Sequence, residues 1–78
     1  MTPEQARAAR AMLKVGVRDV AEATGVTPNT VSRIEAAADP DKRGPQASTI
    51  AVIEAWYVSQ GLEFIPENGG GPGVRLKK

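Results

Sequence analysis

Hydrophobic and polar residues follow helical spacing through most of the chain, with glycine and proline as breaks. Thr2 followed by Pro3 is a helix-start signal, because a threonine hydroxyl can cap the first turn and proline there needs no N–H. We therefore predict a first helix that runs from Pro3 to Leu13 or Lys14 and that Gly16 ends.

The next two predicted helices lie on either side of a glycine. The second spans Val17 to Thr24, and Gly25 ends it because glycine accepts the backbone conformation of a tight turn. Thr27 and Pro28 repeat the start signal found at the beginning of the chain, which predicts a third helix from Pro28 to about Ala37.

The third predicted helix has two distinct faces. At 100° per residue, Val31 and Ile34 lie on one side and are predicted to be buried. The opposite side is polar, mostly uncharged and exposed; it consists of Asn29, Ser32, Arg33 and Ala36. Such a face suits contact with the edges of bases better than general neutralisation of phosphates.

A charged loop is predicted over residues 39–47, which contain prolines and a glycine. Ser48 or Thr49 is predicted to cap a fourth helix that runs to about Gln60. Its hydrophobic stripe comprises Ile50, Ile53 and Tyr57, widened by Val52 and Trp56. Trp56 and Tyr57 are interpreted as packing residues rather than as a stacking platform for bases.

The end of the chain changes character. Two short extended runs, Leu62–Ile65 and Gly73–Leu76, flank a turn signal at Asn68-Gly69. The expected fold class is therefore mainly α, with four to five helices and a short C-terminal β-hairpin or strand pair. We expect a helical domain over residues 1–61 and a β appendage over residues 62–78.

The amino-acid composition excludes several kinds of functional site. The 78 residues include no Cys and no His, which excludes zinc fingers, disulfide frameworks and thiol- or histidine-dependent catalysis. Nothing indicates an enzyme, a cofactor, a metal site or a small-molecule ligand. No secretion signal or membrane span is apparent, so a cytoplasmic protein is expected. A domain of this size is marginal by itself, which makes a partner subunit a reasonable expectation.

The segment from Val20 to Glu35 resembles the helix-turn-helix of the phage repressor and Cro-like (XRE-type) family of bacterial regulators. The residues that carry the resemblance are Val20, Ala21, Gly25, Val26, Val31 and Ile34, together with Arg10 and Glu35. It covers roughly residues 5–59 and implies a lambda-repressor-like fold. It also implies that Arg10 and Glu35 form a structural ion pair between the first and third helices.

The same resemblance implies which residues meet DNA. The expected base-reading residues are Pro28, Asn29, Ser32 and Arg33, and the expected phosphate contacts are Arg18, Thr27, Thr30, Lys42 and Arg43. Two departures matter: Gly16-Val17 stands where many members have Ser-Gln, and Pro28 replaces a frequent polar reader. The first departure implies that a phosphate contact is missing there, for which Arg18 and the loop cations are the substitutes.

A homodimer is expected. Strands of four residues are marginal alone and have open edges, so the hairpin should pair with a second subunit or lie against the fourth helix. The tail from Glu63 to Arg75 also resembles that of a subfamily of small regulators. The residues expected at the dimer interface are Trp56, Tyr57, Phe64, Ile65, Val74 and Leu76. A two-fold dimer would present its recognition helices about 34 Å apart.

These observations predict a sequence-specific, double-stranded DNA-binding transcriptional regulator. Repression by promoter occlusion is the simplest mechanism, because no second domain is seen that could recruit polymerase or sense a ligand. An alternative of another class stays open: a helix-turn-helix fold that binds a second regulatory protein, as an antitoxin-like or anti-activator module. The net charge of only +1 keeps this alternative open, because it is a poorer electrostatic supply for phosphate binding than many DNA-binding domains have.

Overall fold

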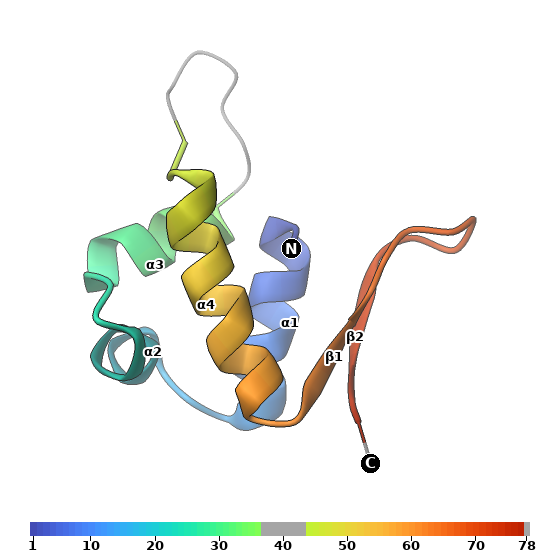
Figure 1. The fold of residues 1–78 in the computed structure, drawn as a ribbon, viewed down its shortest axis with the longest axis horizontal. Coiled ribbons are helices and arrows are strands. Elements are labelled where there is room, and N and C mark those ends of the chain that lie inside the picture. Colours follow the sequence, from blue (N-terminus) through green and yellow to red (C-terminus); the bar gives the residue numbers. More distant parts are fainter. Residues whose placement is uncertain (37–43, 78) are drawn as a thin grey trace.

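The computed structural model describes residues 1–36 and 44–77 of the protein. Within these ranges, four helices precede an antiparallel two-stranded sheet (Figure 1). The elements are α1 (Pro3–Leu13), α2 (Val17–Thr24), α3 (Pro28–Glu35), α4 (Ala47–Ser59), β1 (Leu62–Ile65) and β2 (Gly73–Leu76). The predicted fold class, mainly α with a C-terminal hairpin, is confirmed. None of the helices in the described ranges has the length and apolar character needed to cross a membrane.

Helix α1 begins with a capping box, in which two side chains satisfy backbone N–H groups at the helix start. The Thr2 hydroxyl accepts from the Gln5 N–H at 3.1 Å, and Gln5 Oε1 accepts from the Thr2 N–H at 2.8 Å. The helix ends at Lys14, which adopts a left-handed conformation with φ 57° and ψ 41°. The start of the helix and its last residue agree with the prediction, but the residue that ends it is Lys14 and not Gly16, which caps α2 with φ −88°.

Lys14 is a position where the backbone conformation disfavours the residue that is present. Among the described residues it is the one non-glycine with a positive φ, and its side chain is exposed. Lys14→Gly is expected to raise the free energy of unfolding by about 0.5–1 kcal/mol, because glycine adopts this conformation without a steric cost. Thermal unfolding followed by circular dichroism measures the change. Lys14→Ala, which keeps the Cβ, should give no gain; an equal gain from both variants would contradict the backbone explanation.

The turn between α2 and α3 also follows the prediction, but the end of α3 does not. Gly25 has φ 78° and donates its N–H to the Ala21 carbonyl at 2.9 Å, and Thr27 then caps α3. The prediction that α3 continues to about Ala37 is wrong at Ala36. Ala36 is already extended at φ −77° and ψ 154°, so the helix ends at Glu35. Ala37 itself lies outside the described residues.

Helix α4 begins earlier than predicted. Its N-cap is Gln46, whose carbonyl accepts from the N–H groups of Thr49 and Ile50, both at 3.1 Å. The prediction that Ser48 or Thr49 caps the helix is therefore wrong, because both residues lie inside its first turn. Val52 was expected in the hydrophobic stripe but is 49% exposed.

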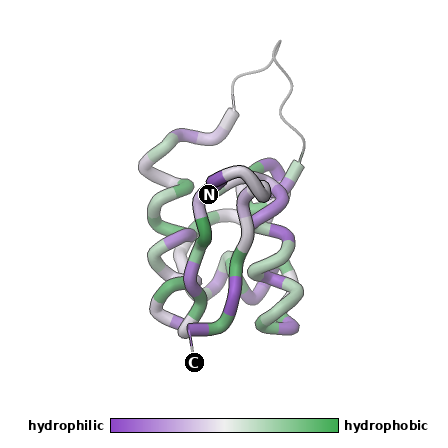
Figure 2. The backbone as a smooth tube through the Cα atoms, turned by 90° about the vertical axis from the view of Figure 1, so that its right-hand side faces the viewer, coloured by the Kyte–Doolittle hydropathy of each residue, from purple (hydrophilic) through white to green (hydrophobic). Residues whose placement is uncertain are grey.

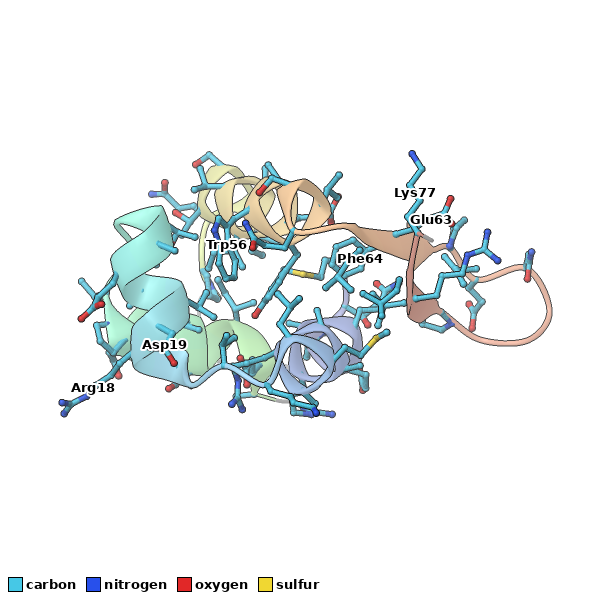
Figure 3. All side chains as sticks on the ribbon, turned by 90° about the horizontal axis from the view of Figure 1, so that it is seen from below. Arg18, Asp19, Trp56, Glu63, Phe64 and Lys77 are labelled. Carbon is cyan, nitrogen blue, oxygen red and sulfur yellow. The ribbon has the colours of Figure 1, made fainter. Side chains whose placement is uncertain are left out.

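The core lies between the helices and is closed by the hairpin. It is formed by the buried residues Ala6, Ala9, Val20, Ala21, Val31, Ile34, Ile53, Tyr57 and Leu62. Trp56 and Phe64 flank the fully buried Tyr57, with ring centroids 5.3 Å and 6.3 Å from its own. Figure 3 shows the side chains of Trp56 and Phe64 directed into this interior. Small alanines of α1 and α2 let each of these helices pack closely against α3, around the larger side chains.

The hairpin lies across the space between α1 and α4, as the view from the hairpin side shows (Figure 2). Gln5 of α1 binds the last residue pair of the hairpin before its turn. Its Nε2 donates to the Ile65 carbonyl at 3.1 Å and to the Gly73 carbonyl at 2.8 Å. On the outward side, Arg75 Nε lies 2.7 Å from Glu63 Oε1. The hairpin is thus part of the single packed unit, at the end opposite to α2 and α3 (Figure 1).

Candidate nucleic-acid interface

An ion pair fixes α3 against α1. Arg10 Nε lies 2.9 Å from Glu35 Oε2, and Arg10 Nη2 lies 3.0 Å from Glu35 Oε1. The Glu35 side chain is only 9% exposed and that of Arg10 30%. Hydrogen bonding to Glu35 raises the pKa of Arg10, while partial burial opposes that rise. Arg7 adds a hydrogen bond from Nη1 to the Glu35 carbonyl. The pair implied by the family resemblance is therefore present, and it sets where the exposed face of α3 points.

Tyr57 extends this polar cluster into the core. Its ring is fully buried, and its hydroxyl is the buried side-chain polar atom that has no hydrogen-bond partner among the described residues. Burial raises the pKa of Tyr57 to about 12; the negative charge of Glu35 adds to the rise and the positive charge of Arg10 reduces it. The phenol is therefore held neutral, and its hydroxyl contributes a desolvation cost without a compensating hydrogen bond.

Tyr57→Phe is expected to leave the stability unchanged or to raise it by up to about 1 kcal/mol near pH 7, because it removes an unpaired buried hydroxyl. Above pH 10 the two proteins should diverge. The folded pKa of about 12 lies above the unfolded value of 10.0, so the wild type binds more protons when folded and loses stability as the pH rises from 10 to 12. The difference of two units between the folded and unfolded pKa corresponds to a loss of about 2.7 kcal/mol in the free energy of unfolding once the pH exceeds 12.

Urea unfolding of both proteins at pH 7, 10 and 11.5 measures this effect. The difference between wild type and Tyr57→Phe isolates the contribution of Tyr57, because all other groups are the same in the two proteins. A variant that is less stable than wild type by more than 1 kcal/mol at pH 7 would show that the hydroxyl has a stabilising partner.

The four residues predicted to read bases lie together on the exposed side of α3. Val31 and Ile34 are buried on the opposite side, so the helix presents one polar face to solvent. The exposed residues of this α3 face are Pro28, Asn29, Ser32 and Arg33. The Asn29 amide and the Arg33 guanidinium are groups of the kind that make bidentate contacts with base edges in the major groove.

Thr27 and Thr30 have different hydrogen-bonding capacity, which the sequence did not reveal. The Thr27 hydroxyl accepts from the Thr30 N–H at 3.3 Å and donates to Thr30 Oγ1 at 3.0 Å. Its single proton is therefore engaged within the helix. Thr30 accepts that bond and keeps its own O–H proton. Since a phosphate oxygen only accepts hydrogen bonds, Thr30 can donate to phosphate, whereas Thr27 acts as the helix cap.

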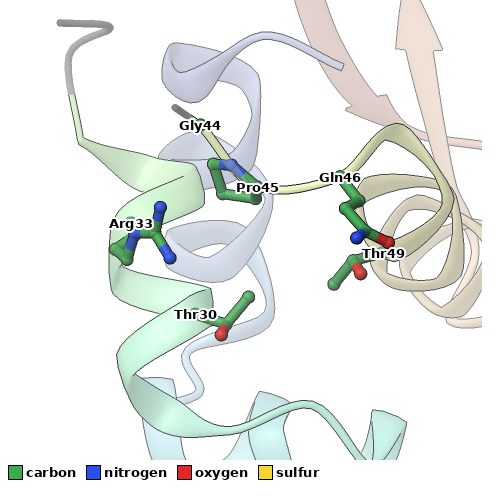
Figure 4. A pocket seen from close by; sticks show the side chains of 6 residues that line it. All are labelled: Thr30, Arg33, Gly44, Pro45, Gln46 and Thr49. Atoms are coloured by element: carbon green, nitrogen blue, oxygen red, sulfur yellow. The ribbon is translucent and has the colours of Figure 1, made fainter. Parts of the chain in front are cut away.

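A cleft separates α3 from the start of α4 and adds donors next to the α3 face. It has a volume of about 350 Å³ and is lined by Thr30, Arg33, Gly44, Pro45, Gln46 and Thr49 (Figure 4). The side chains around it offer a guanidinium, an amide and two hydroxyls, and none of them is acidic. The Gln46 side chain makes no capping hydrogen bond at the start of α4, where backbone N–H groups and the positive end of the helix dipole lie.

The start of α2 is less suited to an anion than the family resemblance implies. The Asp19 carboxylate accepts from the Gly16 N–H at 2.8 Å and so occupies the place at the helix start where a phosphate would bind. Arg18 is exposed and points away from the body of the molecule at the end opposite to the hairpin (Figure 3). Arg18 can therefore reach an anion beyond the helix start, but the helix start itself is occupied.

The residues expected at the dimer interface are mostly turned inward. Tyr57 is fully buried and has no surface to offer a partner. Trp56, Phe64 and Val74 are half-buried and pack against the core. Among the predicted interface residues, Leu76 is the most accessible, at 53% exposed. The remaining predicted phosphate contacts, Lys42 and Arg43, lie outside the described residues.

Sequence reasoning missed Gln46 and Thr49 as members of the site. Both were assigned to a loop or to a helix cap, because the start of α4 was placed too late. The sequence carries no side-chain signal for this helix start, because Gln46 caps α4 through its backbone alone.

The chain was also compared with known proteins. Its sequence matches no protein-family model and no curated protein. Function is therefore inferred from the side chains of α3, the cleft and the start of α2.

Proposed function

We propose that this protein binds double-stranded DNA in a sequence-dependent manner and regulates transcription, with α3 lying in the major groove. The observation that carries the proposal is the α3 face. It combines Asn29, Ser32 and a single arginine on a helix whose opposite side is packed in the core. The ion pair between Arg10 and Glu35 holds that helix in a fixed orientation. A fixed helix favours recognition of particular base pairs over non-specific binding to DNA.

Each residue of the α3 face has a chemical role in this proposal. The Asn29 amide can pair with N6 and N7 of adenine, and the Arg33 guanidinium with O6 and N7 of guanine. Ser32 can donate to or accept from either base of a pair. Pro28 has no donor and offers an apolar edge that suits the methyl group of thymine.

The cleft between α3 and α4 supports a phosphate contact beside the base-reading residues. Its donors surround a concave surface, and Thr30 has an O–H proton to donate. Arg18 lies at the far end of the helix-turn-helix and would meet a second stretch of backbone. Contacts of this kind set the orientation of the helix on the duplex, whereas the α3 face supplies specificity.

Repression is the regulatory effect that needs the least machinery. A bound protein excludes polymerase from an overlapping promoter, and the strength of regulation then follows occupancy.

A salt titration tests the proposal. Binding of the protein to the DNA upstream of its own gene is compared with binding to scrambled DNA of the same length and composition. We expect tighter binding to the natural sequence, with log K falling linearly against log salt by about 0.9 per phosphate contacted. Weak binding of equal strength to both DNAs would contradict a groove-reading regulator.

The alternative of a protein-binding module is favoured by one observation. The Asp19 carboxylate lies at the start of α2, where it repels phosphate, and Glu22 is exposed on the same helix. If the titration shows no sequence preference, a pull-down with the wild type and an Arg33→Ala variant distinguishes a protein partner that uses the α3 face from one that binds elsewhere.

A further inference from the structure

Helix α4 has an exposed face that no other described element covers. We call it the α4 outer face; its exposed residues are Ala47, Ser48, Ala51, Val52, Ala55, Val58 and Ser59. Val52 and Val58 are 49% and 52% exposed. Helix α4 lies in front of the other elements in Figure 1 and along the upper edge of the molecule in Figure 3, with no described helix or strand outside it. A helix that is apolar on all sides is normally buried on all sides.

The α4 outer face differs from the rest of the surface in its charge. The exposed sides of α1, α2 and α3 carry charged residues, including Arg7, Glu22 and Arg33. The single charged residue of α4 is Glu54, which lies at the edge of the face and is 2.9 Å from the Met1 ammonium group. The α4 outer face thus carries no charge of its own, and the charge beside it is already paired.

We propose that the α4 outer face packs against the same face of a second copy of this chain around a two-fold axis. In such an interface each side chain near the axis meets its own counterpart, so any charge there would meet a like charge. The absence of charge over the whole face fits this requirement. A face made for a different partner has no such restriction and can use charge to select its partner.

Side-chain size also favours this arrangement. Alanine and serine along the centre of the face let two helix backbones approach closely, and the two valines can fill the space on either side. Charged residues are generally depleted at the centre of protein interfaces. The interface inferred here differs from the one expected from the sequence, because the aromatic residues of α4 point into the core instead.

The test measures the mass of the full chain in solution without DNA, by sedimentation velocity over a range of concentrations. Ala55 lies at the centre of the α4 outer face at 100° per residue. The wild type should form a dimer, and Ala55→Glu should raise the dimer dissociation constant by at least about 100-fold, because two carboxylates would then meet at the axis. Ala8→Glu makes the same change at an exposed position of α1 and should leave the dimer unchanged.

A second experiment, with opposite charges on the two copies, tests whether the partner of the α4 outer face is another copy of this chain. Ala55→Glu and Ala55→Lys should each be monomeric, and their mixture should form a heterodimer detectable by native mass spectrometry. Circular dichroism confirms that each variant is folded. A wild type that stays monomeric at all concentrations, or an Ala55→Glu variant that dimerises like the wild type, would overturn the proposal. Neither result involves DNA, so this inference and the proposed function can fail separately.

Discussion

Arg10→Met is expected to lower the free energy of unfolding by about 3 kcal/mol. The substitution keeps much of the volume of the side chain but removes three of the hydrogen bonds that hold the Glu35 carboxylate. The Glu35 side chain is 9% exposed and would be left as a nearly buried charge without its partner. An uncompensated buried charge strongly destabilises the folded state. Urea unfolding followed by circular dichroism measures the loss.

Two further variants separate the effect of breaking the ion pair on stability from the effect of losing a long side chain. Arg10→Met combined with Glu35→Leu should recover most of the stability, since an apolar pair often replaces a buried ion pair at little cost. Arg18→Met, at an exposed position, should change the stability by less than about 0.5 kcal/mol. If the single Arg10 variant is as stable as the Arg18 variant, the ion pair does not hold α3 in place.

Arg33→Ala is expected to abolish measurable preference for the natural DNA sequence while leaving the fold intact. The loss of a bidentate base contact corresponds to about 1–3 kcal/mol, or roughly 5- to 150-fold in affinity for the preferred site. Because Arg33 is exposed, its removal leaves the core unchanged. Fluorescence anisotropy with the natural and the scrambled DNA gives both affinities.

Two matched variants show which kind of contact Arg33 makes. Arg33→Lys keeps the charge but not the planar fork, so it should retain non-specific binding and lose much of the preference. Arg18→Ala should weaken binding to both DNAs by a similar factor and reduce the salt dependence, as expected for a phosphate contact. An Arg33→Ala variant that still prefers the natural sequence would contradict docking through the α3 face.

Most of the fold could be predicted because the sequence marks the ends of its elements. Threonine followed by proline starts two helices, glycine ends α2, and both strands have the predicted limits. The start of α4 was missed because its cap is made by the Gln46 backbone, which leaves no side-chain signal. The exposure of Val52 was missed because hydrophobicity alone does not show which side of an apolar helix faces the core.

The candidate site was less predictable. Helical periodicity placed the α3 face correctly, because it depends only on positions within one helix. The cleft depends on how α3 and α4 pack, which a single sequence does not determine. The different roles of Thr27 and Thr30 depend on the direction of one hydrogen bond. The surroundings of the Tyr57 hydroxyl, which has no hydrogen-bond partner among the described residues, depend on how the elements pack.

The position of Gln5 has a consequence for the order of folding. Its side-chain amide is satisfied by the carbonyls of Ile65 and Gly73, which follow it by 60 and 68 residues. The Gln5 amide can therefore be satisfied within the protein only after the hairpin has docked on α1, and its burial requires that both ends of the chain have come together.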